Sequence, residues 1–333
     1  MDRAPDVSIV LCTYNRADML RECVESLLAQ QTNGEFTFEV LVVDNRSTDG
    51  TADLVAEMQE TSPVPLRYVM EPQAGQVFAR HRGFDEARGE WFANFDDDEV
   101  AEPGWVLEML RVARSQNVRS VGGLLWLRLP PDCKRNLHPR VRRILGESVT
   151  WETPRPYTRR QGPGSGTQLI HRSVLEEVGR YDVSQSLRGY DTDLYRRMRE
   201  AGIVSWFAPK SVAYHVTPPS RLTYGYLHET CFHDGFTFCR RDLQHFGKLL
   251  GLPVMLLRLL NAVGRHAPVA LLAKLIGNRE TALAHWLMLV RAEGYARCYM
   301  HLVAPAFPQR GVLQRYGIIP RPTSPATNKA VVS

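Results

Sequence analysis

The sequence predicts an α/β protein whose central sheet is mostly parallel and doubly wound. Over the first hundred residues, short apolar runs rich in β-branched and aromatic residues alternate with segments of helical spacing. The short runs are apolar throughout, as expected of strands that are buried on both faces. Polar residues gather where these runs end, and in a parallel sheet all such ends meet at the edge where ligands bind.

The first half of the chain gives four strand-helix pairs in order. Strands are expected at 7–14, 38–45, 66–71 and 91–96, and helices at 17–30, 51–60, 76–89 and 103–115. In the first helix, helical spacing links Met19, Leu20, Cys23, Leu27 and Leu28. Gly89 ends the third helix and Pro103 begins the fourth, which are positions that these residue types favour.

The second half of the chain is less regular. Strands are expected at 121–129, 166–172, 203–209 and 211–216, and helices at 172–182 and 191–202. Residues 130–164 contain six prolines and a basic group, which predicts a long loop. The expected domains are a sheet domain over 1–218, a helical C-terminal region over 219–320 and a disordered tail over 321–333.

Composition limits the class of protein. The chain has 333 residues, 44% of them hydrophobic and 23% charged, which is typical of a globular protein. A net charge of +5 suits an anionic ligand without indicating a nucleic-acid partner. Six cysteines without a CxxC motif favour a reduced, cytoplasmic setting. The N-terminal apolar run is too short for a signal peptide, and Pro253 and Arg258 interrupt the apolar run at 249–263, so no membrane span is expected.

An acidic cluster ends the fourth expected strand, in "FANFDDDEV". Asp96, Asp97 and Asp98 are consecutive and Glu99 follows them. Such a cluster can bind a divalent metal, act as a general acid and base, or cap the helix that begins at Pro103. Capping needs one carboxylate only and leaves the polar ends of the other strands unexplained. The cluster therefore favours a metal site in a cleft.

Seven segments carry a resemblance to a known family. They are "VSIVLCTYNR", "EVLVVDNRSTDGT", "QAGQVFARHRGFDEARGEWFANFDDDE", "PGWVLEML", "GTQLIHRSVLEEVGRYD", "RGYDTDLYRRMREAG" and "APKSVAYH". In this order and over about residues 6–218, the chain resembles a family 2 glycosyltransferase with the GT-A fold. The resemblance implies a Rossmann-like nucleotide-binding half over about 1–100 and an acceptor half over about 101–218.

The resemblance also implies a metal and its ligands. Asp96 and Asp98 match the family's Asp-x-Asp (DXD) motif, which holds manganese or magnesium (Mn²⁺ or Mg²⁺) against the diphosphate of a nucleotide-sugar, with Asp97 beside it. His215 matches a histidine near the metal, and imidazole can serve as a further ligand. A dication would offset the mutual repulsion of the carboxylates.

Further residues match the family's nucleotide-binding positions. They are Thr13, Tyr14, Asn15, Arg16, Asp44, Ser47 and Arg80. Asp44 matches an acid that contacts the base or ribose, and Arg80 a basic residue that approaches phosphate. Two plainer interpretations stay open: Asp44 caps a turn with Ser47, and Arg80 is a solvated helix residue. His81 stands where the family often has Asn.

A catalytic carboxylate is implied in "RGYDTDLYRRMREAG". The family usually has Glu-Asp there, whereas this chain has Tyr190 followed by Asp191. Asp191 is the candidate general base, and a place at the start of a helix favours its ionised form. The alternative is an N-cap aspartate, and Asp193 is a second candidate base.

Taken together, these matches predict a metal-dependent, inverting glycosyltransferase of the hexosyltransferase type, acting in cell-envelope or polysaccharide biosynthesis. The expected donor is a UDP-sugar, and the acceptor is a carbohydrate or is lipid-linked. Two alternatives stay open: a haloacid-dehalogenase-type phosphotransferase, and a non-catalytic sugar-nucleotide-binding protein. The basic, Leu-rich C-terminal helices pack on the protein or lie on a membrane, which makes a peripheral place at the inner face of the membrane an option.

Overall fold

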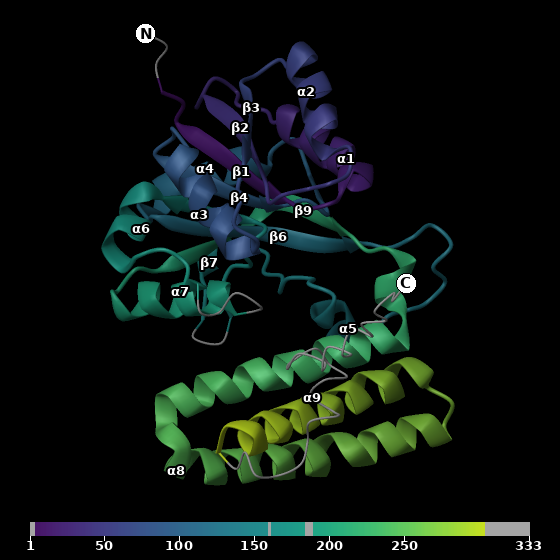
Figure 1. Ribbon diagram of the computed structural model, residues 1–333. Coiled ribbons are helices and arrows are strands. Elements are labelled where there is room, and N and C mark those ends of the chain that lie inside the picture. The colour runs from purple at the N-terminus through teal and green to yellow at the C-terminus, as the bar shows by residue number, and fades with distance from the viewer. Residues whose placement is uncertain (1–3, 159–160, 184–188, 304–333) are drawn as a thin grey trace, which may run out of the picture. The chain divides into compact units, whose positions relative to one another are not determined.

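The computed structural model describes residues 4–158, 161–183 and 189–303 (Figure 1). The chain divides into two compact units. A sheet unit comprises Met1–Lys134 and Leu145–Pro219, and a helical unit comprises Arg135–Ile144 and Ser220–Ser333. The tail expected at 321–333 lies outside the described residues.

The sheet unit has nine strands among its described residues. Eight follow the order β3-β2-β1-β4-β8-β6-β9-β5, and β7 pairs with β9. The first half is parallel as predicted, with β1 (Val7–Thr13), β2 (Phe38–Asp44), β3 (Leu66–Met70) and β4 (Trp91–Asp96). The second half is mixed, because β8 (Gln168–His171) runs antiparallel to both β4 and β6 (Ser120–Arg128).

Helices cover both faces of this sheet. One apolar core joins it to α1 (Ala17–Leu28), α2 (Thr51–Thr61) and α4 (Trp105–Gln116). A second core joins it to α3 (Gln76–Glu86), α6 (Arg172–Val178) and α7 (Tyr190–Glu200). In β1, Ile9 belongs to the first core and Val10 to the second, which is the alternation of a strand that is buried on both faces. The doubly wound α/β prediction is confirmed.

Four elements differ from expectation. The expected loop at 130–164 contains α5 (Pro139–Ile144) and β7 (Arg155–Pro156). The two strands expected at 203–216 form one strand, β9 (Ser205–Val216), whose register with β6 shifts between Gly122 and Leu124. Pro209 falls in this irregular stretch, where its missing N–H costs no ladder bond. The short strand β5 (Glu99–Ala101) gave no sequence signal.

Besides α5, the described part of the helical unit contains long helices that lie side by side (Figure 1). After a 3-10 turn at Pro219–Leu222 come α8 (Tyr224–Leu275) and α9 (Arg279–Val303). Gly247 has a non-helical backbone, with φ 72°, and divides α8 into two segments. Pro253 lies inside the second segment, so the expectation that it interrupts this stretch is wrong. By length and composition, α8 contains a stretch apolar enough to cross a membrane, with 17% of it buried.

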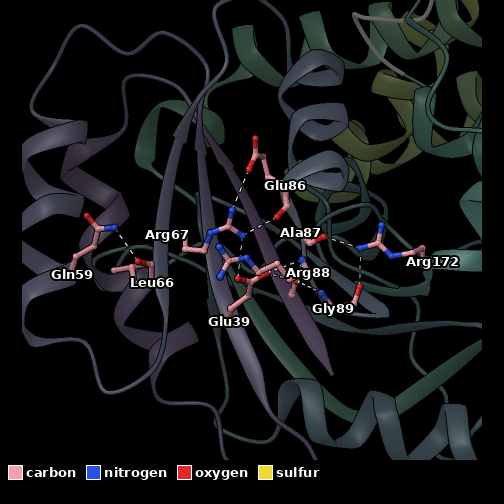
Figure 2. Close-up of polar contacts among 10 residues, drawn as sticks. Glu39, Gln59, Leu66, Arg67, Glu86, Ala87, Arg88, Gly89 and Arg172 are labelled. Carbon is pink, nitrogen blue, oxygen red and sulfur yellow. Dashed lines mark hydrogen bonds and ion pairs between the residues drawn. The ribbon is translucent and has the colours of Figure 1, made fainter. Parts of the chain in front are cut away.

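A buried glutamate ties together the amino ends of β1, β2 and β3 (Figure 2). Glu39 on β2 is 1% exposed and accepts hydrogen bonds from the Ser8 hydroxyl at 2.6 Å and the Arg88 backbone N–H at 3.0 Å. The Arg67 guanidinium lies 3.2 Å from the same carboxylate and also donates to the Glu86 carbonyl oxygen. This network holds β1, β2 and β3 against the end of α3, at the sheet edge opposite the acidic cluster.

Glu39→Ala should lower the free energy of unfolding by about 3 kcal/mol, because the Ser8 hydroxyl and the Arg88 N–H lose their buried acceptor and the only ion pair left to Arg67 is that with Glu86 at 3.1 Å. Glu57 forms an exposed pair with Arg21, and Glu57→Ala should cost less than about 1 kcal/mol. Urea unfolding of the two variants provides the comparison. Equal losses would contradict the assigned role of Glu39.

Candidate active site

Three strand ends place the predicted residues at one edge of the sheet. The register pairs Thr13 with Asp44 and Cys12 with Asp96, so β1 lies between the two acidic strand ends. The Thr13 hydroxyl donates to Asp97 Oδ2 at 2.9 Å, which links the end of β1 to the acidic cluster. The sheet therefore brings these residues together as the sequence predicted.

Asn15 locks the loops that follow β1 and β2. It adopts a left-handed backbone with φ 50°, a conformation that Asn tolerates better than most residues. Its backbone N–H donates to Ser47 Oγ at 2.9 Å, and its Oδ1 accepts from the Thr48 backbone N–H at 2.7 Å. Tyr14 beside it is 57% exposed. The two loops thus form one rigid rim, with an aromatic ring free to contact a ligand.

Asp44 lies beneath this rim and is 2% exposed. Its Oδ1 accepts from the Ser47 backbone N–H at 2.8 Å, and its Oδ2 accepts from the Tyr68 hydroxyl at 2.7 Å. Burial and this carboxylate raise the pKa of the Tyr68 phenol. Asp44 therefore makes the turn-capping contacts of the plainer interpretation, and Ser47 lies between it and the loop of Asn15.

Arg80 is fully buried on α3 and forms an ion pair with Asp96 Oδ1. Its Nε and Nη1 atoms have no hydrogen-bond partner among the described residues. Burial raises the pKa of Asp96, and the Arg80 charge opposes this shift. The interpretation of Arg80 as a solvated helix residue is therefore wrong. Its charge sits behind the acidic cluster and holds Asp96 in place.

Pairing of β5 with β9 brings Asp98 beside His215. Glu99 pairs with His215 in the register, and the Val216 backbone N–H donates to the Asp98 carbonyl oxygen at 2.8 Å. Asp98 is 9% exposed, and its Oδ2 lies 3.5 Å from His215 Nε2 and 3.6 Å from Arg16 Nη1. Asp98, His215 and Arg16, from three separate segments of the chain, thus meet around one carboxylate oxygen.

The backbone contact of His215 places a proton on its Nδ1 atom. Its Nδ1 lies 2.8 Å from the Leu145 carbonyl oxygen, which can only accept, so Nδ1 carries a proton. A histidine that ligates a metal commonly donates its other N–H to a carbonyl in this way. Nε2 and the Asp98 carboxylate then converge on one point, as two ligands of a divalent cation would.

The described residues fit a metal only in part. No group of three His, Cys, Asp or Glu among them is arranged to hold an ion by itself. Asp98 and His215 supply one oxygen and one nitrogen, and Asp96 has Oδ1 committed to Arg80. A metal here would need further oxygen ligands, and the diphosphate of a donor offers such oxygens.

Burial, together with the neighbouring negative charges, raises the pKa of the other acids in the cluster. Burial raises the pKa of Asp97 to about 6, although Arg16 and the Thr13 hydroxyl oppose the shift. Glu99 is 3% exposed, and burial together with Asp96 and Asp98 raises its pKa well above the ordinary value. The carboxylates therefore retain protons at a pH at which exposed acids are ionised.

Two residues at this cluster had no predicted role. Glu99 closes the cluster from β5, and its fourth place in the acidic run was the available signal. Gly166 packs against Asp96 and Glu99, and a Cβ atom there would lie 2.6 Å from Asp96 Oδ2 and still closer to Glu99. Nothing in the sequence distinguishes this glycine from those around it.

Asp191 lies in the first turn of α7, next to the buried ring of Tyr190. The N-cap is Gly189 with φ 94°, so the interpretation of Asp191 as an N-cap is wrong. Asp191 Oδ1 accepts from the Thr192 backbone N–H at 2.7 Å, and burial raises its pKa. Asp191 is near enough to Asp96 for its charge to raise the pKa of that residue.

Asp193 serves a different purpose from Asp191. Its two oxygens form ion pairs with Arg196 at 2.7 Å and Arg197 at 2.8 Å, both on α7. Tyr190, in place of the family's glutamate, packs edge-on against Tyr181 with ring centroids 5.1 Å apart. The helix thus presents Asp191 as its carboxylate nearest the acidic cluster.

The doubly wound sheet, the joined loops after β1 and β2 and the acidic end of β4 are features of a GT-A-like protein. Comparison with known proteins leads to the same class. Residues 8–178 match the family described as "Glycosyl transferase family 2". The chain belongs to this family and is a glycosyltransferase. The alternative of a haloacid-dehalogenase-type phosphotransferase is therefore set aside.

Several individual proteins are similar to the chain. "Succinoglycan biosynthesis protein ExoM" of Rhizobium meliloti is 26% identical over 240 residues, which is 70% of this chain and 74% of that protein. Further relatives match over about a third of their length.

Two solved structures share the fold. Mannosyltransferase PcManGT from Pyrobaculum calidifontis, in complex with GDP-Man and Mn²⁺, has a TM-score of 0.58 at 19% identity and covers 90% of this chain and 88% of its own. S. aureus TarS in complex with UDP has a TM-score of 0.51 at 14% identity and covers 91% and 93%. These likenesses confirm the GT-A fold.

The metal-free protein should lose stability as the pH rises through 6. A carboxylate whose pKa is raised in the folded state opposes folding once it ionises, and the pKa of Asp97 is about 6 against an ordinary value near 4. In the presence of EDTA, the Tm should therefore be lower at pH 7.5 than at pH 4.5, and Asp97→Asn should reduce this difference. Asp53→Asn, at an exposed position on α2, should leave the profile unchanged. Identical profiles for wild type and Asp97→Asn would contradict the buried charge.

Proposed function

We propose that this glycosyltransferase is metal-dependent and inverting, and that it moves a sugar from a UDP-sugar to an acceptor hydroxyl with Asp191 as general base. The observation that carries the proposal is the approach of Asp98 Oδ2 to His215 Nε2 at 3.5 Å. The Leu145 carbonyl oxygen orients this imidazole, and the acidic strand end surrounds the carboxylate. Asp191, at the start of α7, is near enough to Asp96 for its charge to raise the pKa of that residue, which supports the assignment.

Asp98 and His215 would ligate Mn²⁺ or Mg²⁺, and Asp96 would add its free oxygen. When bound, the ion supplies positive charge to the departing diphosphate. Arg80 holds Asp96 from behind, and the Thr13 hydroxyl does the same for Asp97. These contacts limit how far the carboxylates can separate before a cation arrives.

The rim formed by the loops after β1 and β2 would bind the nucleotide. Tyr14 offers an exposed ring for stacking on a base, and Asn15 and Ser47 offer polar groups beside it. Asp44 supports Ser47 from below and would reach the nucleotide only through a local rearrangement. Arg16, near Asp98, is placed to contact a phosphate oxygen.

Asp191 would remove the proton from the acceptor hydroxyl as its oxygen attacks the anomeric carbon. One carboxylate suffices for inversion, because attack and departure occur on opposite faces in a single step. Burial raises the pKa of Asp191, and a raised pKa makes the carboxylate a stronger base. Tyr190 leaves the second carboxylate of the usual family pair absent, so acceptor contacts must come from other groups.

The acceptor is proposed to be a carbohydrate or a lipid-linked sugar in polysaccharide or cell-envelope biosynthesis. The name of the ExoM relative supports this class of pathway. We further propose a cytoplasmic site of action at the inner face of a membrane. The structural relatives are complexes with GDP-Man and with UDP, so the nucleotide is to be tested directly.

Asp98→Asn should weaken UDP binding in the presence of Mn²⁺ by at least about tenfold, because an amide is a poorer ligand than a carboxylate. Isothermal titration of UDP and GDP, with Mn²⁺ and with EDTA, measures both the metal dependence and the choice of nucleotide. Asp53→Asn serves as the control of equal charge change. Equal UDP affinity with and without Mn²⁺ in the wild type would remove the metal from the proposal.

Asp191→Asn should retain UDP and Mn²⁺ binding and lose turnover by about 10²- to 10⁴-fold, since it removes the general base. The wild-type rate should decline at acid pH as Asp191 becomes protonated, above the ordinary aspartate range because its pKa is raised. The matched control is Asp193→Asn, two positions further along α7, where the carboxylate forms ion pairs with Arg196 and Arg197; it should keep turnover within a few-fold. Near-normal turnover of Asp191→Asn, measured as UDP release with sugar acceptors, would eliminate it as the base.

A further inference from the structure

We propose that the second segment of α8 binds the surface of an anionic phospholipid bilayer and lies in its plane. The contact surface, called here the leucine face, consists of exposed residues of this segment and its end: Leu249, Leu250, Leu252, Leu256, Leu257, Leu260, Val263, Leu271, Leu272, Leu275 and Ile276. Leu249 is 92% exposed, Leu275 75% and Leu260 71%. Membrane contact is thus assigned to one part of the helical unit, the second segment of α8.

The apolar residues of this segment are distributed in the reverse of the usual way, with the large ones exposed and the small ones buried. Only one of its buried residues, Met255, has a large apolar side chain. The buried residues are Gly251, Met255, Ala262, His266 and Ala273. They recur at helical spacing and mark the side that packs within the helical unit. The large aliphatic side chains lie on the other side. Since burial of apolar area is the main force that holds helices, the side with most apolar area needs an apolar partner.

Charge indicates what that partner is. From residue 243 to residue 279 the sequence contains five Lys or Arg residues and no Asp or Glu. Arg258 pairs with the buried Asp242 at 2.6 Å, which leaves Lys248, Arg265, Lys274 and Arg279 along the segment and just after it. An apolar face accompanied by cations and no carboxylate is complementary to acyl chains beneath anionic headgroups.

A second group of cations within the helical unit lies next to Arg265. Burial and the charges of Arg265, Arg291 and Arg143 lower the pKa of Arg140, so cations dominate its electrostatic surroundings. His266 Nδ1 lies 3.1 Å from His285 Nδ1, and a contact between two ring nitrogens needs at least one neutral ring. Burial and Arg140 lower the pKa of His266 to about 4. These cations add to the positive charge of the helical unit that carries the leucine face.

The same observations argue against two other occupants. If the segment crossed a bilayer, the Arg258–Asp242 pair and Arg265 would lie within hydrocarbon, where ionised groups are costly. If a second copy covered the leucine face, two identical sets of cations would be brought together, which is unfavourable at an interface. An in-plane helix avoids both costs, because the cations at its margins reach the headgroups.

The role of this docking rests on the proposed function, since a lipid-linked acceptor would lie in the same bilayer. Binding itself is measured without donor, metal or acceptor, so the two proposals fail separately. The full-length chain is mixed with vesicles of pure phosphatidylcholine or of phosphatidylcholine with 30% phosphatidylglycerol, and bound protein is separated by flotation. We expect binding to the anionic vesicles that is at least about tenfold stronger at 0.1 M than at 0.5 M salt.

Leu257→Glu/Leu260→Glu should abolish vesicle binding. The matched control, Gln31→Glu/Gln116→Glu, makes the same charge change at exposed positions of the sheet unit and should keep most of the binding. A Leu260→Trp variant keeps the test valid if the glutamates prevent folding. Its fluorescence, read as the difference from the wild type, should shift to the blue on anionic vesicles only.

Three results would overturn the proposal. One is that the full-length chain binds neither kind of vesicle. This would be the result if residues 304–333 or a second copy covered the leucine face. Another is a lipid-free dimer in sedimentation velocity that Leu257→Glu/Leu260→Glu dissociates. The third is binding that the glutamate variant retains at the wild-type level. In each case, UDP and Mn²⁺ titration of the same preparation shows separately whether the donor site is intact.

Discussion

Four consecutive acids at the end of β4 set the central physical constraint on this protein. Asp96 through Glu99 are packed where burial and mutual repulsion raise the pKa of Asp96, Asp97 and Glu99. The described cations close to them are Arg80 behind Asp96 and Arg16 beside Asp98. Such a cluster is stable only when protons or further cations balance its charge. The same imbalance supports the proposal that the site binds a dication.

The fold supplies the geometry that keeps these acids together. The parallel strands β1 and β4 place Thr13 and Asp96 at one edge, and the short pair of β5 with β9 brings His215 to Asp98. At the opposite edge, the buried Glu39 network ties the amino ends of β1, β2 and β3. With both ends of the strands held, the acidic cluster has little freedom to spread.

Sequence patterns predicted the parallel half of the fold, because apolar periodicity indicates which residues face a core. They did not predict β5, since three residues carry no periodicity. They also did not predict the proline-containing helix α5 or the continuity of β9. Pro253 misled in the same way, because an isolated proline can be accommodated within a long packed helix. The pairing of β5 and the continuity of β9 depend on contacts between distant segments, which no local pattern contains.

At the candidate site, the sequence predicted that the polar strand ends lie at one edge of the sheet, and it left their individual contacts open. Arg80 and Asp44 were expected near the ligand, and the structure places both in buried supporting positions. Glu99 and Gly166 were without a role because their meaning comes from neighbours far along the chain. Residue type was therefore predictable at this site, whereas orientation needed the folded structure.

The most direct measurement of the central claim is an anomalous-difference map from crystals grown with UDP and Mn²⁺. A single strong peak is predicted within coordination distance of the Asp98 carboxylate, His215 Nε2 and the oxygens of the diphosphate. A fully bound UDP without a manganese peak, with His215 still 3.5 Å from Asp98 as an ion pair, would contradict it.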